Sequence, residues 1–177
     1  MSSPFSPPAA ATFTVALFTS TEASTVGNLL TPVELLAAVP QQPPFRFIDE
    51  IREVDDDHIV AAYRFRPEAD FYRGHFPGNP VTPGVLLIEA MAQAGVVALG
   101  IYLLSKTGGP RAIDEFVTLF TEAAVEFSGV VAPGETVTTT GHKLFFRMRK
   151  LRSRVEMHRA DGTLVCAGEL SGIGVRR

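Results

Sequence analysis

The pattern of apolar and polar residues predicts one long buried helix near the middle of the chain. Residues 85–105 are almost entirely apolar, and Pro83-Gly84 before them and Gly108-Gly109-Pro110 after them are typical of helix ends. A helix that is apolar on every side must be buried. The stretch also carries Glu89 and Gln93, so no uninterrupted apolar run approaches the roughly 20 residues of a membrane span. We therefore expect a core helix.

Shorter segments on both sides of this helix are typical of strands. Thr31-Pro32-Val33-Glu34 has the form of a capping box, which predicts a short helix that ends near Val39, before Pro40. Asp55–Asp57, Pro133-Gly134 and Asp161-Gly162 are typical of turns. The expected strands cover residues 45–54, 58–65, 115–122, 123–131, 135–149, 151–159 and 163–175.

The order of these elements predicts an α+β domain. A curved antiparallel sheet wrapped around the long helix would bury it, and such a small sheet leaves an edge that favours dimerisation. Residues 1–28 are rich in Ser, Thr, Ala and Pro and are interpreted as an N-terminal extension, in which residues 12–17 alternate like a short strand. The domain itself is expected to span residues 29–177.

Composition excludes several classes of protein. The chain has 177 residues, 46% of them apolar and 20% charged, which is usual for one soluble globular domain. Its single cysteine, Cys166, excludes an internal disulfide and a cysteine-based zinc site. The apolar patch at residues 9–18 is preceded by no basic residue, which disfavours a secretory signal, so we expect a cytoplasmic protein.

Charge is distributed unevenly along the chain. The net charge is −3, yet residues 143–159 hold seven basic residues against the single acid Glu156. A mildly acidic chain with one basic stripe argues against general nucleic-acid binding and favours a particular acidic partner.

Candidate chemistry is concentrated at the start of the long helix. His75 precedes a proline-stiffened loop, and the amides of Gly84 and Val85 lie at the positive end of the helix. A carboxylate on an apolar helix is costly unless it is paired or protonated, so Glu89 is a candidate general acid. Gln93 lies four residues later on the same helical face and could orient it. A hydrogen-bonded loop histidine and a glycine needed only for packing remain the alternatives for His75 and Gly84.

This segment resembles a known enzyme family. Residues 75–93 read HFPGNPVTPGVLLIEAMAQ, which is similar to the signature of the FabZ-type 3-hydroxyacyl-acyl-carrier-protein dehydratases. Residues 44–49 (PFRFID), residues 131–135 (VAPGE) and the basic strand followed by Asp161-Gly162 extend the resemblance over about residues 29–175. It implies the hot-dog fold, in which a sheet wraps a long helix, and assembly as dimers or as three dimers in a hexamer.

The resemblance also implies a reaction and a site. Water would be eliminated from a (3R)-3-hydroxyacyl thioester to give the trans-2-enoyl thioester, in fatty-acid or polyketide-like biosynthesis. His75 of one chain would be the base and Glu89 of the other the acid, while the Gly84 amide binds the thioester carbonyl and the Val81 carbonyl orients His75. Val85, Gln93 and Phe76 are expected to contact the substrate.

The implied partner is an acyl carrier protein, whose phosphopantetheine arm carries the substrate, and no metal or redox cofactor is needed. Carrier proteins of this kind are acidic and dock electrostatically. The basic stripe supplies candidate docking residues, with a solvated strand face as the alternative for any one of them: Arg147, Arg149, Lys150, Arg152 and Arg154.

The sequence departs from the family pattern at several positions. Gln41-Gln42 replaces a common His-Arg pair, Thr82 replaces a common Met, and Glu122 and Glu126 lie where relatives are usually basic. These departures are compatible with a dehydratase of another pathway or with a heterodimer. A hot-dog thioesterase, with Glu89 activating water, and a non-catalytic acyl-binding subunit are the rival functions, and the presence of both His75 and Glu89 weighs against them.

Overall fold

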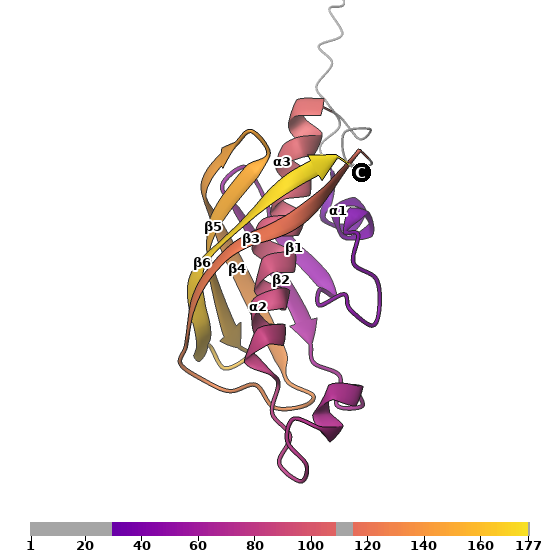
Figure 1. Cartoon of the computed structure of the whole chain (residues 1–177), viewed down its shortest axis with the longest axis vertical. Helices are drawn as coiled ribbons and strands as arrows, with labels where there is room; N and C mark the ends of the chain where they lie inside the picture. The colour runs from indigo at the N-terminus through magenta and orange to yellow at the C-terminus, as the bar shows by residue number, and fades with distance from the viewer. Residues whose placement is uncertain (1–29, 109–114, 177) are drawn as a thin grey trace, which may run out of the picture.

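A six-stranded antiparallel sheet curls around one long helical stretch in the computed structural model, which describes residues 30–108 and 115–176 (Figure 1). The spatial order of the strands is β1-β2-β4-β5-β6-β3. This arrangement confirms the expected α+β hot-dog fold. The strands are β1 (Glu50–Val54), β2 (His58–Arg64), β3 (Phe116–Phe127), β4 (Thr136–Arg147), β5 (Lys150–Arg159) and β6 (Leu164–Arg176). The predicted extension at residues 1–28, with its short strand, lies outside the described residues.

The long helical stretch is buried, as predicted. It consists of α2 (Gly84–Ala92), a π-helical turn η2 (Gln93–Ala98) and α3 (Leu99–Gly108). The stretch is long and apolar enough to cross a membrane, but 72% of its most apolar window is buried inside the protein. The short helix α1 (Pro32–Ala38) begins with the predicted capping box, in which Thr31 and Glu34 bond each other's backbone amides.

The π-helical turn was not predicted, and it lies where the helix makes a close contact with the sheet. The Leu99 amide bonds the Ala94 carbonyl, five residues back, so the Gly95 carbonyl is released. Ser153 on β5 donates its hydroxyl to that carbonyl at 2.7 Å. A Cβ atom on Gly141 of β4 would lie only 2.7 Å from the Gly95 Cα, so glycine at this crossing lets the helix backbone touch the strand backbone.

Two predicted strand boundaries are wrong. The first strand begins at Glu50 and not at Phe45, because the side chain of Gln93 takes the backbone bonds of Phe45 and Phe47. The predicted strands at residues 115–122 and 123–131 form the single strand β3. No turn residues separate them, and the ladder with β6 passes the junction with one bulge between Phe120 and Glu122.

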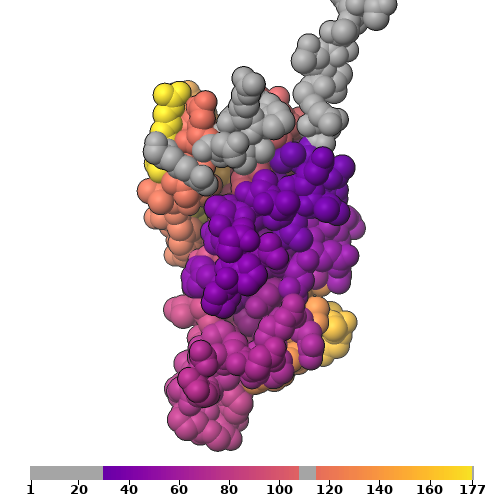
Figure 2. All heavy atoms as spheres, turned by 90° about the vertical axis from the view of Figure 1, so that its right-hand side faces the viewer, coloured from indigo at the N-terminus to yellow at the C-terminus, as the bar shows by residue number. Residues whose placement is uncertain are grey.

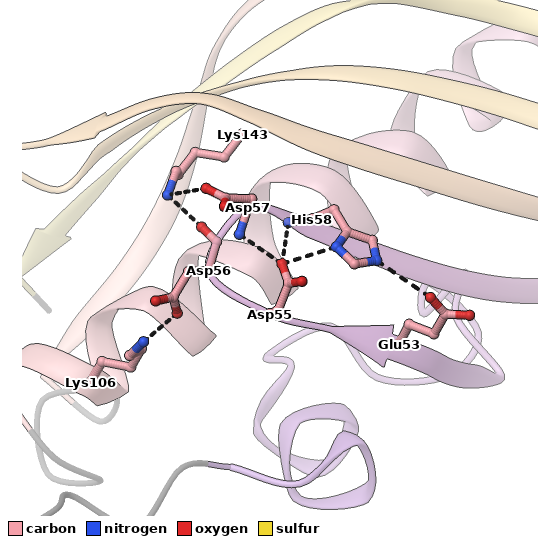
Figure 3. A network of polar contacts seen from close by, with 7 residues as sticks. All are labelled: Glu53, Asp55, Asp56, Asp57, His58, Lys106 and Lys143. Atoms are coloured by element: carbon pink, nitrogen blue, oxygen red, sulfur yellow. Dashed lines mark hydrogen bonds and ion pairs between the residues drawn. The ribbon is translucent and has the colours of Figure 1, made fainter.

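The turn between β1 and β2 is held by a network of charged groups (Figure 3). The Asp55 carboxylate accepts hydrogen bonds from the Asp57 and His58 amides, both at 2.8 Å. Lys106 on α3 pairs with Asp56, and Lys143 on β4 pairs with Asp57 at 3.0 Å. The predicted turn at residues 55–57 therefore also ties the end of α3 and the strand β4 to the β1–β2 hairpin.

His58 makes this network sensitive to pH. Its ring lies 2.9 Å from Asp55 and 3.4 Å from Glu53, and it stacks against the His142 ring. Burial lowers the pKa of His58, but the hydrogen bonds and negative charges of Glu53 and Asp55 outweigh that effect and hold the pKa above the ordinary value. A raised pKa in the folded state stabilises the fold below the unfolded pKa, and this contribution is lost as pH rises through the folded value.

We therefore expect the free energy of unfolding to fall as pH rises from about 6 to about 8, the range in which histidine titrates. Urea titrations at several pH values measure this slope. The variant His58→Gln should show a shallower slope, whereas His158→Gln, on another strand, should keep the wild-type one. Equal slopes in wild type and His58→Gln would contradict the assignment.

Candidate active site

The predicted site segment forms a loop that projects beyond the lower end of the sheet (Figures 1 and 2). It follows the 3-10 helix η1 (Asp70–Arg73) and leads into α2 at Gly84. Residues 76–80 are exposed, so this loop has little apolar packing of its own. Hydrogen bonds at its two ends therefore determine its shape.

His75 is fixed by a reciprocal pair of bonds with Val81. The Val81 amide donates to the His75 carbonyl, and His75 Nδ1 lies 3.0 Å from the Val81 carbonyl oxygen. A carbonyl can only accept, so Nδ1 carries a proton in this bond, and in the neutral imidazole Nε2 then keeps its lone pair. The structure thus shows the His75–Val81 contact that the resemblance implied, and it leaves a basic nitrogen available.

The helix start supplies amide donors next to this loop. Gly84 is the first residue of α2, so its N–H and that of Val85 have no carbonyl partner within the helix. The Phe127 ring packs against Gly84, where an added Cβ would lie 3.1 Å from a ring carbon. The side chains of Val85 and Phe76 are mostly exposed to solvent within one chain, so the single chain does not enclose a substrate at these two positions.

Glu89 is held by Gln93, as predicted. Gln93 Nε2 donates to Glu89 Oε1 at 2.8 Å and to the Phe45 carbonyl at 2.8 Å, while Gln93 Oε1 accepts from the Phe47 amide at 2.7 Å. The Phe47 amide is a donor only, so it fixes which end of the Gln93 amide faces Glu89. The Gln93 side chain is fully buried and uses both of its N–H groups. Glu89 Oε2 has no hydrogen-bond partner among the residues that the structure describes.

Glu89 lines a cavity of about 40 Å³ whose other walls come from the segment after α1, from the core helix and from β3. The Gln41 side-chain oxygen is buried, has no hydrogen-bond partner among the described residues, and belongs to the same cavity. His75 is not among its lining residues: Gln41, Glu89, Ala92, Val96, Val97, Thr118 and Phe120. The acid and the base are therefore both ordered, but they do not share this cavity within one chain.

Part of the positive charge of the basic stripe is offset by carboxylates from other strands. Arg152 and Arg154 on β5 pair with Glu169 on β6 at 2.8 and 3.3 Å, and Lys150 lies 3.9 Å from Glu122 on β3. The first two arginines line an open hollow of about 720 Å³ together with three carboxylates, Glu126, Glu156 and Glu169.

The end of the β4–β5 hairpin has a different character. Arg147 is exposed and forms no ion pair with any residue of ranges 30–108 and 115–176. Arg149 packs over the Phe116 ring and donates to the Gly174 carbonyl. Among the five predicted docking residues, Arg147 and Arg149 are thus the two that pair with no carboxylate of residues 30–108 and 115–176.

Other reactive groups do not contribute to the site. Cys166 is fully buried, and burial raises the pKa of its thiol to about 11, so it remains protonated and unreactive. Among residues 30–108 and 115–176, no three histidine, cysteine or acidic side chains lie close enough to hold a metal ion.

Sequence reasoning missed two polar contacts that shape the site. The first is the pair of hydrogen bonds from the Gln93 side chain to the backbone of Phe47 and Phe45, which precede Gln93 by 46 and 48 positions in the sequence. The second is a buried hydroxyl pair between Tyr72 and Thr82. No local pattern signals either contact, although Thr82 already stood out as a departure from the family motif.

Comparison with known proteins agrees with this geometry. A FabA-like domain matches residues 39–170. The chain is 34% identical over 147 residues to a 3-hydroxyacyl-[acyl-carrier-protein] dehydratase FabZ of Herpetosiphon aurantiacus, covering 80% of this chain and 96% of the relative. It is 33% identical over 141 residues to a FabZ of Clostridium perfringens, with 77% and 93% covered. The chain belongs to the FabA-like family, and within it to the FabZ-type dehydratases.

Solved structures show the same fold at lower sequence identity. A chain of the dehydratase heterocomplex ApeI:P from Xenorhabdus doucetiae matches with a TM-score of 0.65 at 17% identity, covering 84% of this chain and 93% of that one. A thioesterase from Haemophilus influenzae matches with a TM-score of 0.60 at 14% identity, covering 85% and 94%. These two likenesses confirm the hot-dog fold.

The Gln93 contacts predict a measurable loss of stability. In Gln93→Leu the Phe47 amide and the Phe45 carbonyl lose their partner, which should lower the free energy of unfolding by about 2–5 kcal/mol. Gln42→Leu, which removes one peripheral bond to the Val39 carbonyl, is the matched control and should cost about 1 kcal/mol or less. Urea unfolding measures both, and equal losses would contradict the structural role of Gln93.

Proposed function

We propose that this chain dehydrates (3R)-3-hydroxyacyl thioesters carried by an acyl carrier protein to trans-2-enoyl thioesters, in fatty-acid or polyketide-like biosynthesis. The observation that supports this most directly is the pair of oriented groups. Val81 holds His75 with a basic nitrogen free, and Gln93 holds Glu89 with one carboxyl oxygen free. Elimination of water needs a base that removes the proton from the α-carbon and an acid that protonates the hydroxyl on the neighbouring carbon.

His75 performs the first half of the reaction in this proposal. Its Nε2 removes the α-proton, and the electron pair of the broken C–H bond moves toward the thioester carbonyl. The Gly84 amide, at the positive end of α2, donates a hydrogen bond to the carbonyl oxygen as negative charge develops there. The Val81 carbonyl stabilises the imidazolium that results.

Glu89 performs the second half. The electron pair returns to form the carbon–carbon double bond, the C–O bond of the hydroxyl breaks, and Glu89 Oε2 gives its proton to the departing oxygen. The cavity beside Glu89 has room for a water-sized group and contains polar atoms of Gln41 and Thr118 that can bind it. Transfer of the proton from His75 to Glu89 then restores the enzyme. No metal or redox cofactor takes part.

We further propose that the site is shared between two copies of this chain. Among the described residues, β3 pairs only with β6, so its other edge of 12 residues is open. Leu119, Phe120 and Phe127 on β3 and Val85 on α2 are exposed apolar residues. A second β3 along this edge would satisfy its backbone and cover these side chains. It would also supply Glu89 with a histidine from the partner.

The roles of His75 and Glu89 can be tested by single substitution. His75→Ala and Glu89→Gln should each lower kcat by about 10²–10⁴-fold, the usual contribution of a general acid or base. Gel filtration should show unchanged oligomers, because neither residue belongs to β3, whose edge joins the two chains in this proposal. Tyr102→Phe, at a buried tyrosine of α3, should keep wild-type rates. Near-wild-type turnover in both site variants would refute the proposed function.

A mixed dimer tests the shared site. If His75→Ala and Glu89→Gln chains are co-expressed with different tags and purified through both, one of the two sites in each dimer is intact. Turnover should then return to about half of the wild-type value. A mixed dimer as inactive as the two parents would place both residues of a site on one chain.

We propose that the carrier protein docks at the end of the β4–β5 hairpin, around Arg147 and Arg149. Lys150, Arg152 and Arg154 were predicted to take part, but Glu122 and Glu169 already offset part of their charge. Within the described part of the chain, Arg147 and Arg149 form no ion pair with a carboxylate. Met148 between them is largely exposed, and Leu144 and Phe145 add apolar surface. Such a basic and apolar tip suits an acidic carrier.

Charge reversal separates docking from chemistry. The double variant Arg147→Glu/Arg149→Glu should raise KM for carrier-bound substrate about tenfold and change KM for a short soluble thioester less than about twofold. Arg52→Glu, which reverses an exposed cation on β1, is the control and should affect neither value. Equal effects on both substrates would remove the docking proposal.

A cytoplasmic location follows from the proposed partner and is part of the same proposal. Thioester hydrolysis is the rival chemistry, since thioesterases share the fold. In that rival reaction Glu89 activates the water, so the mechanism gives no role to a histidine that the Val81 carbonyl orients. The contacts of His75 therefore favour dehydration.

A further inference from the structure

We propose that the buried hydroxyl pair of Tyr72 and Thr82 is a positioning device that sets the place of the His75 base relative to the Gly84 amide. The inference rests on the proposed function. The two hydroxyl oxygens are 2.6 Å apart, and each side chain is only 6% exposed. The pair joins the residues on either side of the loop that carries His75.

Thr82 lies at a decisive point of the chain. Val81, which holds His75, precedes it, and Pro83 and Gly84, which begin α2, follow it. Its amide donates to the Val131 carbonyl at 2.9 Å. A displacement of Thr82 would therefore change the position of Val81, which holds His75, relative to Gly84, where α2 begins.

Tyr72 holds the other end of the loop. It belongs to η1, and its neighbour Phe71 accepts hydrogen bonds from the Gly74 and His75 amides through its carbonyl. Burial raises the pKa of Tyr72, so its hydroxyl stays protonated at any assay pH near neutrality. The buried Tyr72–Thr82 bond thus joins the two ends of the loop that carries His75.

The exposed tip of the loop makes this bond important. Residues 76–80 have little packing that could hold His75 in place. Among the described residues, the ties of this loop are the Phe71 carbonyl bonds, the His75–Val81 pair, the Tyr72–Thr82 pair and the bond from the Thr82 amide to the Val131 carbonyl. Of these, the Tyr72–Thr82 pair is the only one that joins two buried side chains. The departure of Thr82 from the family motif then has a structural meaning, because methionine would offer the Tyr72 hydroxyl only a weakly accepting sulfur and no donor.

Removal of either hydroxyl should impair the chemical step and leave substrate binding nearly intact. We expect kcat to fall about 10–100-fold in Tyr72→Phe and in Thr82→Val, because displacements near 1 Å have effects of this size. KM should stay within about twofold of wild type. Thr82→Ser keeps the hydroxyl and should retain most of kcat. Tyr102→Phe, whose tyrosine is also 6% exposed, is the matched control and should behave as wild type.

The double variant Tyr72→Phe/Thr82→Val distinguishes positioning from mere stability. It leaves no buried hydroxyl unpaired, so it should fold at least as well as the single variants. If the pair positions His75, its kcat should be as low as that of the single variants and not lower. Recovery of wild-type kcat in the double variant would overturn the proposal, and so would wild-type kcat in both single variants. If a single variant does not fold, the kcat values of the double variant and of Thr82→Ser still test the proposal.

Amide exchange of Val81 provides a readout that does not depend on turnover. The Val81 amide bonds the His75 carbonyl, so it should exchange about tenfold faster in the double variant than in Tyr102→Phe. Unchanged protection would overturn the positioning role. Absence of activity in the wild-type chain, with the exchange result as expected, would instead count against the proposed function alone.

Discussion

The side-chain amide of Gln93 is the interaction on which the site depends most. It lies at the junction of α2 and the π-helical turn and is fully buried. It binds three partners: Glu89 one turn earlier on the same helical stretch, and the Phe45 and Phe47 backbone in a distant segment. By taking the Phe45 and Phe47 backbone bonds it keeps that segment out of the sheet. By donating to Glu89 it also orients the acid. The burial of one polar group thus couples the core helix, the path of residues 45–49 and the chemistry.

The second constraint is that the core helix must pass very close to the sheet. Gly95 and Gly141 meet without side chains between them, and Ser153 takes the carbonyl that the π-helical turn releases. This contact fixes the helix along its axis. Gly84 and Glu89 belong to the same continuous helix, so their positions relative to the sheet follow from it. The loop with His75 has the least apolar packing against the core, and hydrogen bonds hold it in place instead.

Much of this could be predicted from the sequence because the relevant signals are local. The capping box at Thr31, the turn at residues 55–57, the all-apolar helix and the 14-residue separation of His75 and Glu89 are each visible in a short stretch of chain. The late start of β1, the π-helical turn and the undivided β3 could not be predicted, since each is decided by a partner far away in sequence. The ion pairs of the basic stripe could not be predicted for the same reason. Glu169 on β6 pairs with Arg152 and Arg154 on β5, Glu122 on β3 lies near Lys150, and strand order is not a local property.

The most direct measurement identifies the product of the purified chain. A (3R)-3-hydroxyacyl thioester on an acyl carrier protein is incubated with the enzyme, and the intact carrier is weighed by mass spectrometry. The proposed roles of His75 and Glu89 predict a carrier lighter by one water, with the thioester intact and a trans-2 double bond in the acyl group. Release of the free acid and the free carrier thiol without any enoyl product would contradict the account.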